Sequence, residues 1–329
     1  MLRFAVRRLL SLVVTMFAVS LVAFAIIQLP PGDFLTSYMA NLASDSQGNN
    51  DRLIEQMREN YGLDQPVYVQ YWKWMSNILT KGDFGQSFEW TRPVEEVVAS
   101  RMGMTIVLSF ATLMITWMIA LPIGIYSAVR QYSPGDYIAS IVGFIGVAVP
   151  DFLISLVLMY IAFKYFNQSV GGLFSPDYEN AAWSWNKVLD LISHLWIPVL
   201  IIGLSGTASL IRVMRANLLD ELRKPYVMTA RARGLSEWRV IMKYPVRVAL
   251  NPFISTVGWV LPGLVSGSII VAVVLSLPTV GPLLLRSLLT QDMYLAGAFI
   301  LMLSVLTMVG TLISDLLLAL IDPRIRYSR

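Results

Sequence analysis

Residues 224–250 read KPYVMTARARGLSEWRVIMKYPVRVAL and form the longest polar interval in the C-terminal half of the chain, between two strongly apolar spans. Pro225 lacks a backbone N–H and suits the first turn of a helix, which we expect over residues 227–233. Gly234 stands where a left-handed residue would end that helix, and Ser236 can cap a second helix that Pro245 bounds. Two helices of about two turns each are unstable alone in water, so this interval needs a docking surface.

The composition is that of a membrane protein. Of the 329 residues, 56% are hydrophobic and 14% are charged, with a mean hydropathy of +0.63, whereas soluble proteins average about 25% charged residues. The apolar residues come in runs long enough to cross a hydrocarbon core of about 30 Å. The net charge of +4 follows membrane topology and predicts no nucleic-acid partner. The chain has no cysteine, which excludes disulfides and thiol catalysis.

We predict an all-α polytopic membrane protein with six transmembrane helices and with both termini in the cytoplasm. The organisation that we expect is a first transmembrane helix at 1–29, an extracytoplasmic region at 30–100, a five-helix core at 101–321 that contains a polar loop at 216–250, and a tail at 322–329. Within this scheme the apolar spans cover about 9–29, 103–129, 137–166, 194–214, 252–277 and 295–321. The alternative for the first span is a cleaved signal peptide, but its apolar run is longer than usual and lacks an Ala-x-Ala exit.

The distribution of positive charge agrees with this topology. The proposed cytoplasmic segments hold 16 Lys and Arg residues, and the proposed outer segments hold 8 although they are longer. Cytoplasmic loops carry such an excess in most membrane proteins. Within the outer region, residues 67–79 have helical spacing and an aromatic stripe that would pack on the bilayer surface or on a partner; its members are Tyr68, Tyr71, Trp72, Trp74 and Met75.

No hydrolytic or redox site is visible in the sequence. Gly82 and Gly85 have no Gly-Lys-Ser/Thr after them, so they are not part of a phosphate-binding loop. The single histidine, His194, has no second imidazole or cysteine to share a metal with, and we interpret it as an interfacial residue. We therefore expect no cofactor on this chain, and any energy must come from outside it.

Two carboxylates are predicted to lie inside spans, where acids are costly and are candidates for function. Asp151 follows Pro150, so it either lines a pathway or bonds to backbone groups that the proline frees. Asp315 in the sixth span has a structural role in our interpretation, paired with an arginine or a helix terminus. The fifth span is expected to be bent and closely packed. Its small and helix-breaking residues complete the pathway candidates: Gly258, Pro262, Gly263 and Gly267.

A resemblance to a known family appears in the polar interval. Ala230-Arg231-Ala232-Arg233-Gly234, followed at helical distance by Val240-Ile241, resembles the coupling loop of permease subunits of binding-protein-dependent ABC importers, in the dipeptide/oligopeptide (peptide/nickel) branch. The similarity extends over nearly the whole chain. Its supporting segments are Pro31-Gly32-Asp33, Tyr61-Gly62-Leu63-Asp64-Gln65-Pro66, Gly82-Asp83-Phe84-Gly85-Gln86-Ser87 and Asp322-Pro323-Arg324-Ile325-Arg326.

The resemblance implies a permease of the type I importer fold in the bacterial inner membrane, with a peripheral first helix. The implied partners are a second similar permease, two ATPase subunits that bind ATP and Mg²⁺, an extracytoplasmic solute-binding protein and membrane lipid. The substrate would be a peptide, with oligosaccharide or nickel as alternatives. The residues expected to couple to the ATPase are Ala230, Arg231, Ala232, Arg233, Gly234, Ser236, Glu237, Val240 and Ile241. Two rival classes are an ion-coupled secondary transporter, for which the sequence shows no inverted repeat, and a non-transporting membrane scaffold.

Overall fold

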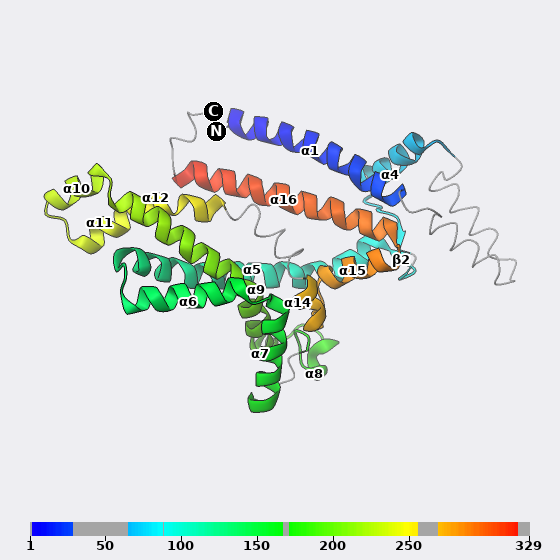
Figure 1. Ribbon diagram of the computed structural model, residues 1–329. Helices are drawn as coiled ribbons and strands as arrows, with labels where there is room; N and C mark the ends of the chain where they lie inside the picture. Colours follow the sequence, from blue (N-terminus) through cyan, green and yellow to red (C-terminus); the bar gives the residue numbers. More distant parts are fainter. Residues whose placement is uncertain (1, 29–64, 88, 167–170, 256–268, 322–329) are drawn as a thin grey trace, which may run out of the picture. The chain divides into compact units, whose positions relative to one another are not determined.

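The computed structural model describes residues 2–28, 65–87, 89–166, 171–255 and 269–321, and these residues are almost all helical (Figure 1). The expected all-α class is confirmed. In the described ranges, the strands are limited to an antiparallel pair, β1 (Gln86–Ser87) and β2 (Arg92–Pro93). The helices are α1 (Leu2–Gln28), α4 (Val67–Lys81), α5 (Val94–Val129), α6 (Pro134–Ala148), α7 (Asp151–Phe166), α8 (Pro176–Glu179), α9 (Trp185–Leu222), α10 (Pro225–Ala232), α11 (Glu237–Lys243), α12 (Pro245–Ala249), α14 (Ile269–Val274), α15 (Val280–Leu289) and α16 (Met293–Ile321).

Four of the described helices contain a segment long and apolar enough to cross a membrane. These segments are Leu10–Gln28, Val94–Val129, Trp185–Leu204 and Met293–Leu318, and the pair α6 and α7 makes a fifth if it is counted as one broken span. The segments agree with the first, second, fourth and sixth spans expected from the sequence. The middle half of the expected fifth span, residues 256–268, lies outside the described residues, so the total of six stays a prediction.

Two of the helices begin earlier than hydropathy predicts. Helix α5 begins at Val94 and not near Gly103, with Glu95 and Glu96 in its first turn, where the helix dipole favours negative charge. Helix α9 begins at Trp185 and not at His194. Both beginnings are polar enough to lower the local hydropathy, and for this reason a hydropathy window places them outside the helix.

The expected third span is not one helix. Helix α6 ends at Ala148, α7 begins at Asp151, and the two helices meet at an angle of 103°. Pro150 lies at the break and cannot donate the backbone hydrogen bond that a continuous helix requires. Its carbonyl instead accepts the first bonds of α7, from the N–H groups of Leu153 (2.9 Å) and Ile154 (3.3 Å).

The chain divides into two compact units. One unit groups the described residues within Met104–Pro278 and those from Thr307 onward, and the other groups those within Leu2–Gly103 and Thr279–Leu306. The core of the first unit includes a cluster in which Met214, Leu218 and Phe253 are fully buried. In the second unit, Phe24 of α1 packs on Tyr71 and Trp74 of α4, with ring centroids 5.5 and 5.7 Å apart.

A buried carboxylate organises the second unit, and the sequence analysis missed it. Asp292 is fully buried immediately before α16 and accepts hydrogen bonds from the Ser87 hydroxyl (2.6 Å) and the backbone N–H groups of Glu89 and Leu295 (both 3.3 Å). It therefore caps α16 and fixes the end of β1 at the same time. Nearby, the Glu89 carboxylate pairs with Arg286 of α15.

Several sequence-based predictions fall outside the described residues. They concern residues 30–64 of the expected extracytoplasmic region at 30–100, the tail at 322–329 and four of the pathway candidates in the fifth span, Gly258, Pro262, Gly263 and Gly267. The expected helix over residues 67–79 is described and is confirmed as α4. The interval between the expected fifth and sixth spans contains the ten-residue helix α15.

Candidate functional site

The polar interval begins where α9 ends, and a carboxylate joins the two. Glu221, in the last turn of α9, accepts hydrogen bonds from the Lys224 ammonium and the Tyr226 hydroxyl, each at 2.5 Å. Burial, and then the Glu221 carboxylate, raise the pKa of Tyr226 above its usual value, so the phenol stays protonated and keeps donating. Helix α10 is thus held by its first residues to the end of α9. Its first residue is Pro225, which the sequence predicted to lie in the first turn of a helix.

Helices α10 and α11 form a small hairpin with its own apolar centre. Val227, Ala230 and Val240 are buried, with exposures of 0%, 5% and 0%, and Leu235 and Tyr244 pack against them. Ala230 and Val240 therefore lie between the halves of the hairpin, and the coupling role expected of them stays a prediction. A helix hairpin must bury an apolar contact between its own halves, and these two residues supply it.

The turn between the two helices is the one expected from Gly234. Its φ is +73°, in the left-handed region, and its N–H donates to the Arg231 carbonyl at 2.9 Å. Glycine adopts this conformation without the steric cost that a Cβ adds. Apart from Gly234 and its two chain neighbours, no residue has an atom within 4 Å of the position where a Cβ would be, so the backbone conformation, and not the space, requires a glycine here.

A salt bridge closes the hairpin across this turn. The Arg231 guanidinium donates to both Glu237 carboxylate oxygens, and the shortest of these distances is 2.6 Å. The hydrogen bond from Arg231 lowers the pKa of Glu237, and the bond to Glu237 raises the pKa of Arg231, so both stay charged at neutral pH. Ser236 precedes α11, but its side chain makes no capping hydrogen bond. The prediction of a side-chain cap by Ser236 is therefore wrong. The Glu237 carboxylate instead joins the two helices across the turn by accepting hydrogen bonds from Arg231.

The predicted coupling residues fall into an exposed group and a buried group. The exposed members are Arg231, Ala232, Arg233, Gly234, Ser236 and Glu237. The buried members are Ala230 and Val240 in the hairpin and Ile241, which is 4% exposed and belongs to the core cluster of α5, α9 and α12. Sequence reasoning missed two exposed apolar side chains on the hairpin, Met228 (64%) and Trp238 (70%). A tryptophan within a short basic helix is the signal in the sequence that could have drawn attention to these two side chains.

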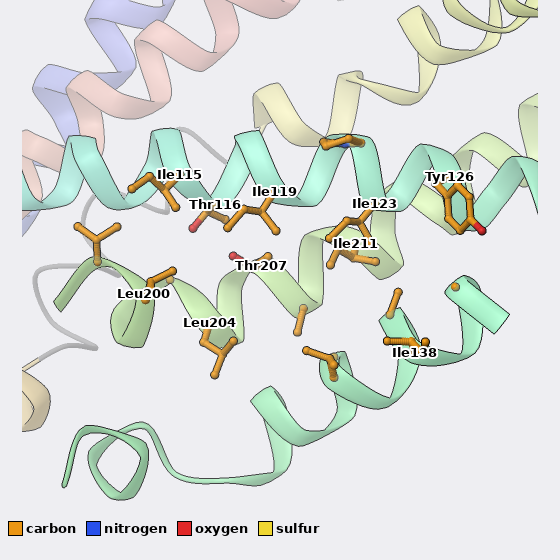
Figure 2. Close-up of a pocket in the computed structure, with 18 residues that line it drawn as sticks. Ile115, Thr116, Ile119, Ile123, Tyr126, Ile138, Leu200, Leu204, Thr207 and Ile211 are labelled. Carbon is orange, nitrogen blue, oxygen red and sulfur yellow. The ribbon is translucent and has the colours of Figure 1, made fainter. Parts of the chain in front are cut away.

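A pocket of about 450 Å³ lies between α5, α6 and α9 (Figure 2). Aliphatic side chains form nearly all of its wall, including Ile115, Ile119 and Leu204, and Thr116 and Thr207 lie near its middle (Figure 2). The packing around it is tight, because a Cβ on Gly203 would lie 2.9 Å from the Thr116 hydroxyl oxygen. The lining includes neither Asp151 nor any charged residue.

An ion pair fixes α6 to α9 beside this pocket. The Asp136 carboxylate, which is 3% exposed, accepts two hydrogen bonds from the Arg215 guanidinium, both at 3.0 Å. It also accepts the N–H of Tyr132 at 3.0 Å. Bidentate pairing of this kind gives a fixed geometry as well as energy. Our sequence analysis assigned no role to Asp136, since its partner lies 79 residues away.

The structure places Asp151 and Asp315 without bringing them together in one site. Asp151 is the first residue of α7, and its carbonyl accepts the Ser155 hydroxyl at 2.8 Å. Asp315 is half-buried in α16 next to Ser314, whose hydroxyl donates to the Ile254 carbonyl at 2.8 Å. His194 lies in α9, with its Nδ1 2.9 Å from the Asp190 carbonyl. The described residues contain no group of three or more His, Cys, Asp and Glu that could hold a metal ion.

Comparison with known proteins decides the family. Residues 120–327 match the model of the binding-protein-dependent transport system inner membrane component, and residues 1–109 match the model of its N-terminal part. The chain belongs to this family. It is therefore an inner-membrane transport component, and the family role is that of a permease and not of a catalyst.

Relatives with this role match the chain from end to end. It is 35% identical to the oligopeptide transport system permease protein AppB of Bacillus subtilis (strain 168), over 98% of this chain and 99% of the relative. It is 32% identical to the glutathione transport system permease protein GsiC of Escherichia coli (strain K12), over 99% and 100% of the two chains. A putative peptide permease protein of Brucella ovis is 32% identical over the whole of both chains.

Proposed function

We propose that this chain is a transmembrane permease subunit of an ATP-driven importer of peptides. Full-length similarity to permeases named for oligopeptide, peptide and glutathione transport supports the substrate class. The energy would come from two partner ATPase subunits that bind ATP and Mg²⁺. A second permease would complete the pathway, and an extracytoplasmic solute-binding protein would deliver the substrate.

The hairpin of α10 and α11 would be the part that receives the movement of an ATPase subunit. Its exposed residues offer two kinds of contact, the apolar side chains Met228 and Trp238 and the guanidinium of Arg233. Apolar and aromatic anchors surrounded by polar groups are typical of protein interfaces. The surface is small, so it suits a contact that opens and closes during transport.

The hairpin can transmit a displacement because it is attached to the membrane helices at two points. Glu221 attaches the start of α10 to the end of α9 through its bonds to Lys224 and Tyr226. Ile241 attaches α11 to the cluster in which α5, α9 and α12 pack together. Packed cores move as bodies and do not deform continuously, so tilting the hairpin would tilt these helices.

The pocket between α5, α6 and α9 does not offer a binding site for a peptide. A peptide carries one N–H and one C=O at nearly every residue, and each costs about 1–3 kcal/mol when buried without a partner. The hydroxyls of Thr116 and Thr207 are too few to bind several such groups. We infer that the peptide passes along a surface completed by the second permease.

Reconstitution tests the proposed function. The chain should be assembled in proteoliposomes with its candidate ATPase, second permease and binding protein, and uptake of labelled di- and oligopeptides measured with and without ATP. We expect ATP-dependent uptake of peptide that disappears when this chain is omitted. Uptake of nickel or an oligosaccharide in place of peptide would contradict the substrate class. ATP-independent uptake driven by an ion gradient would contradict the importer mechanism and favour a secondary transporter.

A further inference from the structure

Helix α4 has four large apolar or aromatic side chains that are exposed, and three of them share one face of the helix. Tyr68, Trp72 and Leu79 have exposures of 69%, 61% and 77%. The intervals of four and seven residues between them place all three on one face of the helix, because an α-helix has 3.6 residues per turn. The opposite side of α4 carries Asn77 and Lys81.

The position of α4 along α1 gives its depth in a bilayer. The apolar segment Leu10–Gln28 has 19 residues, which is about 28 Å of helix, close to the hydrocarbon thickness of about 30 Å. Gln28 is therefore at the border of the hydrocarbon. Its side chain donates a hydrogen bond to the Gln70 side chain of α4 at 2.9 Å, so one side of α4 is at the level of this border.

Tyr71, which follows Gln70 in α4, contacts α1 at a level nearer to the middle of the bilayer. The Tyr71 hydroxyl lies 2.8 Å from the Ser20 hydroxyl, and Ser20 is eight residues before Gln28, about 12 Å deeper along α1. Between these two levels, the ring of Phe24 contacts Tyr71 and Trp74. Helix α4 thus crosses α1 near Phe24, about 6 Å inside the border.

The two contacts also define which face of α4 is deeper. On a helical projection, the exposed apolar face lies nearer to the direction of Tyr71 than to that of Gln70; its residues are Tyr68, Trp72 and Leu79. The polar residues Asn77 and Lys81 lie near the direction of Gln70. The exposed apolar face is therefore on the side that points into the bilayer. Figure 1 shows α4 at the end of α1 and not alongside its whole length.

We propose that α4 is an interfacial helix, which lies in the bilayer surface where α1 ends and sets Tyr68, Trp72 and Leu79 against lipid acyl chains. Helices of this kind bury their apolar face by about 5–10 Å, and the 6 Å level of Phe24 falls within that range. Tyrosine and tryptophan are the residues enriched at this depth, because their rings are apolar and their tips form hydrogen bonds. Lys81 in the last turn can extend toward the lipid headgroups.

The neighbouring surface of α1 supports lipid over a protein partner. Val14, Phe17 and Leu21 are 69%, 50% and 43% exposed within the apolar span, and residues three and four apart lie on one face. An apolar face that is bare over such a length within a membrane span fits acyl chains. The exposed face of α4 continues this surface at its border.

Spin labelling tests this proposal, and the chain suits it because it has no cysteine. Leu79→Cys and Trp72→Cys report on the apolar face, and Lys81→Cys is the matched control on the opposite face. The complete importer is placed in phosphatidylethanolamine and phosphatidylglycerol vesicles. Collisions of each label are measured with oxygen, which dissolves in acyl chains, and with a water-soluble nickel chelate.

We expect the ratio of oxygen to nickel collisions to be several-fold higher at positions 72 and 79 than at position 81. Nickel collisions as frequent at 72 and 79 as at 81 would overturn the proposal, since the face would then be in water. Few collisions with either reagent at 72 and 79 would also overturn it, because the face would then be covered by protein. The result does not depend on which substrate the importer carries.

Discussion

Replacing Gly234 should separate the folding of the membrane helices from the proposed coupling to an ATPase. With φ at +73°, a β-branched residue would cost about 1–2 kcal/mol, which is large for two short helices and small for the membrane core. We predict that Gly234→Val inserts and accumulates normally, while uptake and ATPase attachment fall. The measurement is peptide uptake and ATPase copurification in membranes matched for permease content.

Two control variants isolate the backbone effect at this position. Gly206 is a glycine of α9 that also has no atom near its missing Cβ, but its φ is not left-handed, so Gly206→Val should preserve ATPase attachment. Gly234→Asn should retain most of the activity, because asparagine tolerates the left-handed region. Equal loss in Gly234→Val and Gly234→Asn would show that strain is not the cause.

Ala230 and Ala232 are two alanines of α10 with opposite environments. Ala230 is buried against Val227 and Val240, whereas Ala232 is exposed. We predict that Ala230→Glu opens the hairpin, because a carboxylate there would be buried without a partner. Ala232→Glu should leave the hairpin closed and weaken only the attachment of the ATPase.

Proteolysis distinguishes the two alanine variants. Limited digestion of membranes should cleave the region around residues 224–250 faster in Ala230→Glu than in the wild type, and at the wild-type rate in Ala232→Glu. The same rate in both variants would contradict the buried position of Ala230. Full ATPase retention in Ala232→Glu would remove this face of α10 from the docking surface.

The salt bridge between Arg231 and Glu237 predicts how the hairpin responds to pH. The pKa of Glu237 is lowered below its usual 4.5 by the bond from Arg231, so the stabilisation is present above pH 4.5 and is lost as the pH falls through the lower, folded-state pKa. Both side chains are about half-exposed, which limits the contribution to about 0.2–1 kcal/mol. The protection from hydrogen exchange that this pair gives the hairpin amides should therefore stay constant between pH 6 and 8.

Replacing the carboxylate checks this prediction. Glu237→Gln should slightly raise the rate of hydrogen exchange in the hairpin at neutral pH. If the wild-type hairpin loses more protection in acid than the rest of the protein does, this additional loss should be absent in Glu237→Gln. A variant that exchanges like the wild type at pH 7 and also below pH 4 would show that the salt bridge contributes no measurable stability.

At the scale of the elements, the ion pair between α6 and α9 is the contact to test. Asp136 is buried and depends on Arg215, so Arg215→Met leaves a buried carboxylate without its guanidinium, at a cost of about 3 kcal/mol. We predict a clear fall in the thermal unfolding temperature of the purified protein. Arg212→Met is the control, because Arg212 is on the same helix and exposed. Equal shifts in the two variants would contradict a specific role for the pair.

The helices themselves were largely predictable, and the errors have physical causes. Hydropathy located the apolar parts of α1, α5, α9 and α16, since a span must be apolar over about 20 residues. It could not locate the polar first turns of α5 and α9, where capping and charge act in place of burial. It also joined α6 and α7 into one span, because hydropathy does not register a proline break.

In the hairpin of α10 and α11, the sequence predicted the backbone turns but not which side chains are buried. Glycine and proline determine backbone conformation by themselves, so Gly234, Pro225 and Pro245 were correctly placed from the sequence. Whether Ala230 faces a partner or the other half of the hairpin depends on how two helices pack. The sequence of one helix does not contain that information, nor does it contain the pairing of Asp136 with Arg215.

For the whole molecule, the topology is the prediction on which the other functional proposals depend. If the positive charges indicate the cytoplasmic side, the end of α4 and the hairpin of α10 and α11 lie on opposite sides of the membrane. Thr80 and Thr229 provide a matched pair, because both are exposed and both hydroxyls donate to the carbonyl four residues before them. In intact cells, a membrane-impermeant maleimide should label Thr80→Cys and not Thr229→Cys, and in inside-out vesicles the order should reverse. Labelling of both positions from the same side would place the hairpin where no cytoplasmic ATPase could reach it, and the proposed coupling would fail with the topology.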